Sequence, residues 1–143
     1  MEYFTGSTGR VLVLRLDPGD MLLESIVDVT EKEGLETAVV ISGVGTLDRC
    51  YLHSVTTTGY PPQEERLVWE NAPLELLSLN GVVARGEPHL HAVVSDVKSV
   101  YGGHLEEKSR VLYLAEVVML EVESLALTRA PDKQGIRRLK KLV

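Results

Sequence analysis

Three of the four histidines in this 143-residue chain lie close together, in the stretches GEPHLHAVVSD and VYGGHL. Residues two apart in a β-strand project to the same face, with Cα atoms about 6.6 Å apart. His89 and His91 therefore point together, and both imidazoles can reach one ion at Zn–N distances of about 2.0–2.1 Å. His104 follows a Gly-Gly pair, which permits a sharp reversal that can bring a third imidazole alongside them.

Three imidazoles with one open coordination position are typical of a reactive zinc site rather than a closed structural one. The sequence therefore predicts a divalent-metal site, with zinc as the expected ion, at His89, His91 and His104. The alternative interpretation is that these are ordinary histidines whose ring nitrogens are satisfied by hydrogen bonds. His53 lies on a separate predicted strand and is a candidate for a fourth ligand or an outer contact.

Acidic residues near the histidines could orient a ligand or handle protons. Each is explained equally well as an ordinary carboxylate at the edge of a strand. The candidates are Glu75, Asp96 and Glu116.

Four familiar motifs fail on inspection. SGVGTL lacks the third glycine of a dinucleotide loop and is followed by a predicted strand rather than a helix, so a tight turn is expected there. RGEP resembles the core of an AT-hook, but Glu87 replaces the second arginine that the negative minor groove requires. His-x-His occurs in cupins, whose glycine and glutamate spacings are not matched, and no Gly-x-Ser-x-Gly elbow supports a serine nucleophile.

Length and composition indicate a single domain over residues 1–143 with an ordinary core. Hydrophobic residues make up 44% and charged residues 25%, as in soluble globular chains. No apolar run approaches the roughly 18 residues that span a bilayer, and the first residues do not form a secretory signal. With Cys50 as the single cysteine, we expect a cytoplasmic protein without a membrane partner.

The net charge of −6 is unevenly distributed. Residues 129–143 hold six basic residues and one acid, which gives +5 and leaves −11 on residues 1–128. Such an acidic body repels phosphates, so DNA binding is possible only through this basic tail. The tail is predicted to form a solvated, amphipathic C-terminal helix.

The patterning predicts an α+β domain, built mainly from antiparallel strands. Strands are expected at 10–16, 37–42 and 47–55, with a helix over 20–33. Four further stretches separated by short turns are strand-like: LVWE, PLELLSLNGVVA, PHLHAVVSD and RVLYLAEVVMLEVESLAL. Asn80-Gly81 fits either a hairpin turn or a glycine kink within one strand.

The last long strand carries apolar residues on both sides. Val118 and Leu120 project to one face, and Val117 and Met119 to the other. Both faces therefore need cover, and a partner subunit could supply it.

The stretches SGVGTL, LELLSLNGVV, PHLHAVVSD, VYGGHL and AEVVMLEV, in this order, resemble the plant and prokaryote conserved (PPC) domain over about residues 10–129. RAPDKQGIRRL is similar to the stretch that usually closes the family's domain. The resemblance implies an α+β domain with few helices that assembles as a homotrimer. Some prokaryotic members hold a metal at a histidine cluster, and the matching positions here are His89, His91 and His104.

In plants this domain follows AT-hooks that bind DNA, and stand-alone prokaryotic members are often called DNA-binding by analogy. This chain has no hook. We therefore expect a trimeric metal-binding protein rather than an enzyme, with no catalytic residue assigned. The alternatives are a DNA-binding protein that uses the basic tail, a metal-dependent enzyme or small-molecule binder in which Glu75 or Asp96 moves protons, and an oligomerisation module without chemistry.

Overall fold

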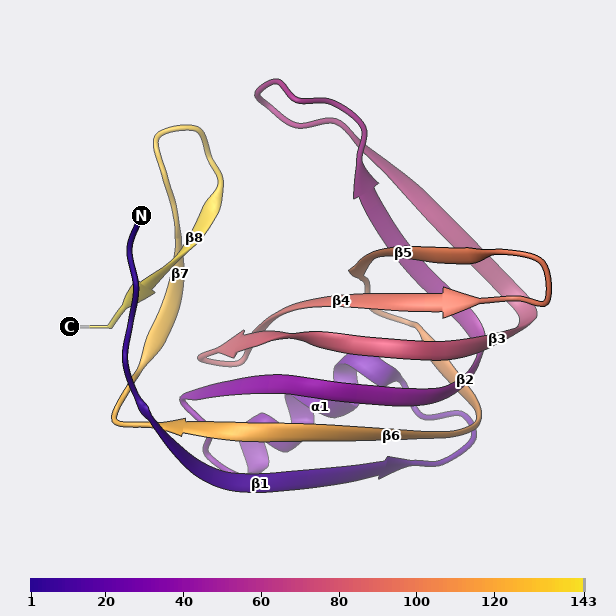
Figure 1. The fold of residues 1–143 in the computed structure, drawn as a ribbon, viewed down its shortest axis with the longest axis horizontal. Helices are drawn as coiled ribbons and strands as arrows, with labels where there is room; N and C mark the ends of the chain where they lie inside the picture. The colour runs from indigo at the N-terminus through magenta and orange to yellow at the C-terminus, as the bar shows by residue number, and fades with distance from the viewer. Residues whose placement is uncertain (143) are drawn as a thin grey trace.

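A six-stranded antiparallel sheet dominates the computed structural model, which describes residues 1–142 (Figure 1). Its strand order is β1-β6-β2-β3-β4-β5, and a separate two-stranded hairpin, β7-β8, follows it. The elements are β1 (Ser7–Leu16), α1 (Leu22–Lys32), β2 (Thr37–Val55), β3 (Glu64–Ala84), β4 (Glu87–Ser95), β5 (Val100–Leu105), β6 (Arg110–Glu123), β7 (Leu127–Pro131) and β8 (Arg137–Lys141). A mainly antiparallel α+β fold with one main helix is thereby confirmed.

β2 pairs with three other strands. It runs beside β3 from Thr37 to Val55, beside β6 through residues 38–49, and beside β5 at Leu52 and His53. Because β3 also pairs with β4, and β4 with β5, the strands from β2 to β5 form a closed circuit. This closure brings residues from distant parts of the sequence onto one surface.

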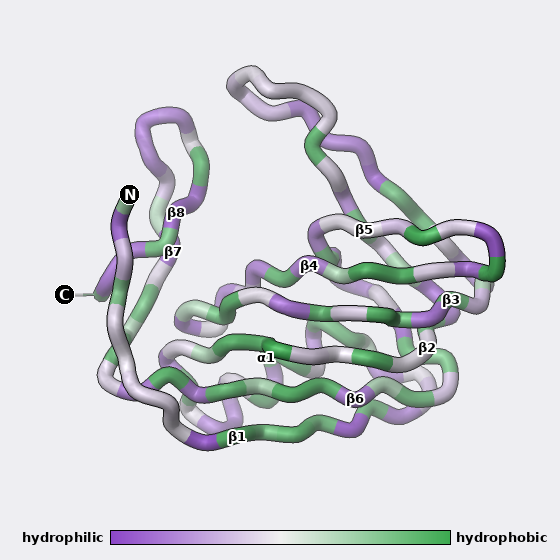
Figure 2. Tube along the Cα trace, viewed as in Figure 1, coloured by the Kyte–Doolittle hydropathy of each residue, from purple (hydrophilic) through white to green (hydrophobic). Residues whose placement is uncertain are grey.

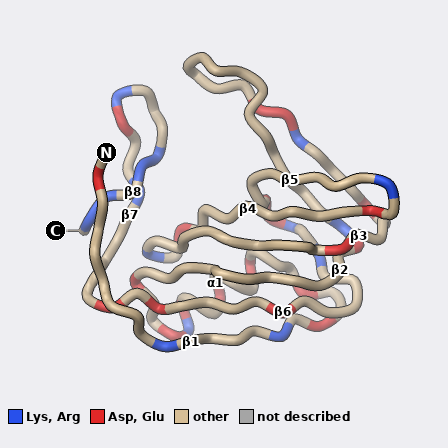
Figure 3. The backbone as a smooth tube through the Cα atoms, viewed as in Figure 1, with Lys and Arg blue, Asp and Glu red and all other residues tan. Residues whose placement is uncertain are grey.

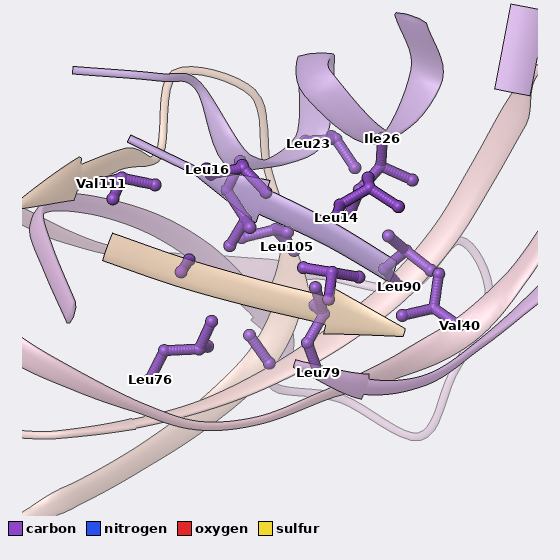
Figure 4. Close-up of a cluster of buried hydrophobic side chains, with 14 of the residues drawn as sticks. Leu14, Leu16, Leu23, Ile26, Val40, Leu76, Leu79, Leu90, Leu105 and Val111 are labelled. Carbon is purple, nitrogen blue, oxygen red and sulfur yellow. The ribbon is translucent and has the colours of Figure 1, made fainter. Parts of the chain in front are cut away.

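The core lies between α1 and the inner face of the sheet. Leu22 and Ile26 of α1 are fully buried and belong to the same cluster as Leu14 and Leu16 of β1 (Figure 4). Burying a side chain of this size stabilises the fold by about 1.5–3 kcal/mol, which anchors the helix to the sheet. The helix ends where the sequence predicts, with Gly34 in the left-handed region at φ +66°. It has only 11 residues and is too short to cross a membrane.

Gly45 and Gly81, at two positions where the sequence is compatible with a turn, lie inside strands. The turn predicted at SGVGTL is wrong, because Gly45 has φ +152° within β2, and a Cβ there would lie 2.3 Å from the Leu114 carbonyl oxygen. Asn80-Gly81 proves to be a kink within β3: Gly81 has φ +147°, and its Cβ would lie 2.1 Å from the His89 carbonyl oxygen. Both glycines let neighbouring backbones approach more closely than a side chain permits.

The predicted C-terminal helix is wrong, because the basic tail forms the β7-β8 hairpin. Leu125 and Leu127 pack beside Ala84 in a second small cluster, against which Phe4 and Leu139 also pack. The apolar residues of the tail are therefore anchored, while its charged residues remain at the surface. Figure 3 shows that Lys and Arg gather on this hairpin, and Figure 2 shows that it is more hydrophilic than β1, β2 and β6.

The outer face of the sheet is apolar over much of its area. One cross-strand row runs Val11, Leu120, Val39, Val82 and His89, through β1, β6, β2, β3 and β4. Residues paired directly across antiparallel strands project to the same face. This face also carries exposed hydrophobic side chains, among them Val13, Ile41, Val44, Leu77 and Val93.

Gly81→Ala is expected to destabilise the fold by about 1–3 kcal/mol, because it combines a positive φ with a clash against the His89 carbonyl. Urea unfolding measures this free energy directly. Gly59→Ala is the control, since a Cβ at Gly59 meets nothing within 4 Å. Equal stability of the two variants would contradict this account of the kink.

Candidate metal centre

Strand pairing places the histidines in a cross-strand row. His53 of β2 is paired with His104 of β5, and His104 is paired in turn with His91 of β4. His89 precedes His91 by two residues and shares its face. The structure thus brings together all four histidines of the chain, from three strands.

Three of the four imidazoles form a compact set of ligand atoms. One ring nitrogen from each of His89, His91 and His104 lies within 4.8 Å of the other two. The Nε2 atoms of His89 and His91 are 3.3 Å apart. Nitrogens at tetrahedral angles and about 2.1 Å from a common ion lie roughly 3.4 Å apart, so modest side-chain rotations complete the geometry. The donor set therefore fits a borderline-soft divalent ion.

His53 lies beside this set and is held by acids that the sequence analysis did not identify. Its ring stacks on that of His104, with centroids 4.5 Å apart. Its Nδ1 lies 2.6 Å from Glu106 Oε1, and its Nε2 lies 3.8 Å from Glu64 Oε1. The spacing of Glu106, two residues after His104, is the only local signal that could have indicated this contact.

The acids suggested from the sequence lie elsewhere. Glu75 is paired with Ser95 at the far end of β4, four residues and about 13 Å along the strand from His91. Asp96 caps the β4–β5 turn, where its carboxylate accepts hydrogen bonds from the backbone N–H groups of Lys98 and Ser99. The structure does not bring these two carboxylates to the histidines.

Glu116 is also placed away from the cluster. It lies on β6, paired with Val44 of β2 and with Arg15 of β1. Its side chain is exposed, and β2 and β3 lie between β6 and β4 in the sheet.

Two of the imidazoles resist protonation. Burial and then repulsion from the neighbouring imidazoles of His53, His89 and His91 lower the pKa of His104 to about 4. The pKa of His89 is lowered by burial first, and then by Arg129. A neutral imidazole has a free lone pair, so these two rings are ready to bind a metal near neutral pH.

A groove opens above the histidines. His53, His89 and His104 line a cavity of about 620 Å³ whose walls come from the β2–β3 connection, at Pro61 and Pro62, and from the β7-β8 hairpin. In Figure 1 the β7-β8 hairpin lies to the left of β4, and the β2–β3 hairpin projects above β5. A second hollow of about 650 Å³ adjoins His89 and His91 and shares the wall formed by β7-β8.

Fold and site together define a mainly antiparallel α+β domain with three imidazoles gathered beneath an open groove. The chain belongs to the Plants and Prokaryotes Conserved (PCC) domain family, whose domain matches residues 3–123. This is the PPC domain that the ordered sequence stretches resemble, so the resemblance is confirmed.

Solved structures share this fold over nearly the whole chain. A metal-containing protein from Archaeoglobus fulgidus, AF0104, is 29% identical with a TM-score of 0.82, and the match covers 96% of this chain and 98% of that one. A PPC protein from Pyrococcus horikoshii is 31% identical with a TM-score of 0.81, over 100% and 99% of the two chains.

A curated relative extends the comparison to a longer protein. The bifunctional protein GlmU of Synechococcus sp. (strain JA-3-3Ab) is 33% identical over 129 residues, which are 90% of this chain. The chain spans about a fifth of the length of this relative, since the match covers 20% of it.

The shifted pKa of His104 predicts a pH-dependent stability for the metal-free protein. The unfolded chain binds this proton near the ordinary pKa of 6.5, but the folded chain binds it only near 4. The free energy of unfolding is therefore retained above 6.5 and falls as the pH drops from 6.5 towards 4. Urea unfolding in a chelator measures this slope, and His104→Gln is expected to make it shallower. Identical slopes in wild type and variant would contradict the assignment.

Proposed function

We propose that the protein is a trimeric metal-binding member of this family, with zinc held by His89, His91 and His104. The observation that carries the proposal is the approach of three imidazole nitrogens, from two strands, to within 4.8 Å of one another. The AF0104 protein is described as metal-containing and shares the fold over 96% of this chain, which supports the same proposal.

The donor types favour zinc over magnesium or calcium. Magnesium and calcium require oxygen ligands, whereas this set offers three nitrogens. Three protein ligands leave one coordination position for a further group. When bound, such an ion supplies a Lewis acid, while His53, held by Glu106, lies against the ring of His104 from the side.

Trimer formation is proposed on the outer face of the sheet. Val11 and Val13 of β1 are 62% and 73% exposed, and Ile41 of β2 is 51% exposed. Large apolar patches on one face mark an interaction surface. Copies of this chain are the proposed cover, because the family resemblance implies a homotrimer and β6 carries apolar residues on both sides.

DNA binding is less well supported than metal binding, because the distribution of charged residues does not favour it. Arg137 is bound by Glu87 and Arg138 by Asp132, so two of the six basic residues of the tail are already paired. The remaining basic residues stand against an excess of eleven negative charges on residues 1–128. Phosphate binding requires unpaired cations, and these two arginines are engaged by carboxylates.

Protein purified without a histidine tag is expected to carry about one zinc ion per chain, and His91→Ala about a tenth of that or less, because two imidazoles hold zinc far more weakly than three. Atomic absorption on dialysed protein measures both. His53→Ala is the matched control, since it removes an imidazole of the row that lies outside the three-ligand set, and it is expected to retain the ion. Wild-type protein with less than about a tenth of an ion per chain would refute the proposal.

The double substitution Val13→Asp and Ile41→Asp is expected to dissociate the trimer, because burying two unpaired carboxylates is costly. Light scattering is expected to give three times 15.8 kDa for the wild type and 15.8 kDa for the variant. Val97→Asp alters a fully exposed residue of the β4–β5 turn and serves as the control that remains trimeric. A monomeric wild type would contradict the proposed trimer.

A further inference from the structure

Three arginines from the β7-β8 hairpin line the hollows above the histidines. Arg137 is held by both carboxylate oxygens of Glu87, at 2.8 and 2.6 Å, and Arg138 is held by Asp132. Arg129 differs from them. Within residues 1–142 it makes no ion pair, although it lines both hollows together with His89.

The hydrogen-bonding capacity of Arg129 is largely unused. A guanidinium has five N–H donors and stays charged in proteins. One of them, on Nη2, donates to the Val82 carbonyl oxygen at 3.5 Å, the outer limit for such a bond. Nε is buried and has no partner among the described residues. Buried polar groups in native proteins nearly always have partners, so this donor needs an explanation.

Neighbouring charges do not supply that partner. Glu87 raises the pKa of Arg129 from a distance, but burial lowers it by more, and Arg137 engages both oxygens of Glu87. Glu64, the other acid in this cavity, lies 3.8 Å from His53 instead. Arg129 is therefore a charged, partly desolvated donor that lines a cavity, and its Nε has no acceptor among the described residues.

The second anchor is the histidine cluster itself. His89 and His104 line the same cavity as Arg129. A divalent ion on the three imidazoles would place a second positive charge in this cavity, with a coordination position left open. The cavity of about 620 Å³ falls within the range that holds small-molecule ligands.

We propose that this groove binds a small organic oxyanion, a carboxylate or a phosphate ester, with one oxygen on the metal ion and another on the Arg129 guanidinium. The inference rests on the proposed metal site and gives its ligand class. The planar fork of arginine matches both oxyanions, which present two or more acceptor oxygens. The paired Arg137 and Arg138 form the wall of the groove and do not contact the anion.

Cobalt-loaded protein tests both anchors together. Inorganic phosphate and acetate are titrated in separate arms, with calorimetry for affinity and the visible cobalt spectrum as a report of whether the anion reaches the ion. At least one anion is expected to bind and shift the spectrum. Arg129→Met is expected to weaken its affinity about 10- to 100-fold, as for the loss of a charge-assisted hydrogen bond, without changing the metal content. Arg138→Met, in the same hairpin but paired with Asp132, is the matched control and is expected to bind as wild type does.

The outcomes separate this inference from the metal proposal. A wild type that takes up no metal contradicts the proposed function, and with it the two-anchor site. A metal-loaded wild type that binds neither anion, or an Arg129→Met variant that binds the anion as wild type does, overturns only the inference drawn here. Arg129→Lys keeps the charge and the stem, so a clear loss of affinity in that variant assigns the effect to the guanidinium fork rather than to misfolding. Binding of phosphate but not acetate would favour the phosphate-ester class, and the reverse would favour the carboxylate class.

Discussion

The pairing of β5 with β2 is the contact on which the site depends. Leu52 lies opposite Leu105, and both are almost fully buried, so this pair closes the core on the inner side. The next pair along the strands is His53 with His104. Because alternate residues of a strand project to opposite faces, burial of the leucines forces these imidazoles outward. A slip of one residue would put both rings in the core, so hydrophobic packing determines the register of the histidine row.

That register has an electrostatic consequence. Burial opposes protonation of His104, and the imidazoles around it oppose it further. The alternative interpretation, ordinary hydrogen-bonded histidines, describes His53, whose Nδ1 meets Glu106. It does not describe His89 and His91, whose ring nitrogens within residues 1–142 reach only each other. Imidazoles that gather in a groove without protein hydrogen-bond partners are typical of a binding site rather than of structural histidines.

The features that could be predicted from the sequence were those that follow from the residue periodicity of a single strand or helix. His89 and His91 follow from the two-residue period of a strand, and α1 follows from its apolar face and Gly34. Gly45 and Gly81 could not be placed, because a positive φ serves a turn and a close strand crossing equally well.

Contacts between residues far apart in the sequence could not be predicted from the sequence alone. The approach of Glu106 to His53 spans 53 residues and depends on the return of β5. The tail was predicted to be a helix because its basic residues mask the two short strands of the hairpin, whose register pairs Leu127 with Lys141. That error also concealed Arg129, since a solvated helix would place it away from the histidines. The fold class was therefore accessible from pattern, whereas the groove required the tertiary structure.

The apolar surface proposed for trimer formation and the histidine cluster lie on the same outer face of the sheet. The row from Val11 through Leu120, Val39 and Val82 ends at His89, so the apolar area and the histidines occupy one continuous surface. A copy of the chain that covers β1, β6 and β2 would lie against the apolar side of this surface. It would leave the other side bounded by the β7-β8 hairpin, whose Arg129 already lines the hollows around His89. In the proposed trimer such a copy would border the groove, and any exclusion of water there would strengthen the attraction between the proposed anion and its two proposed anchors.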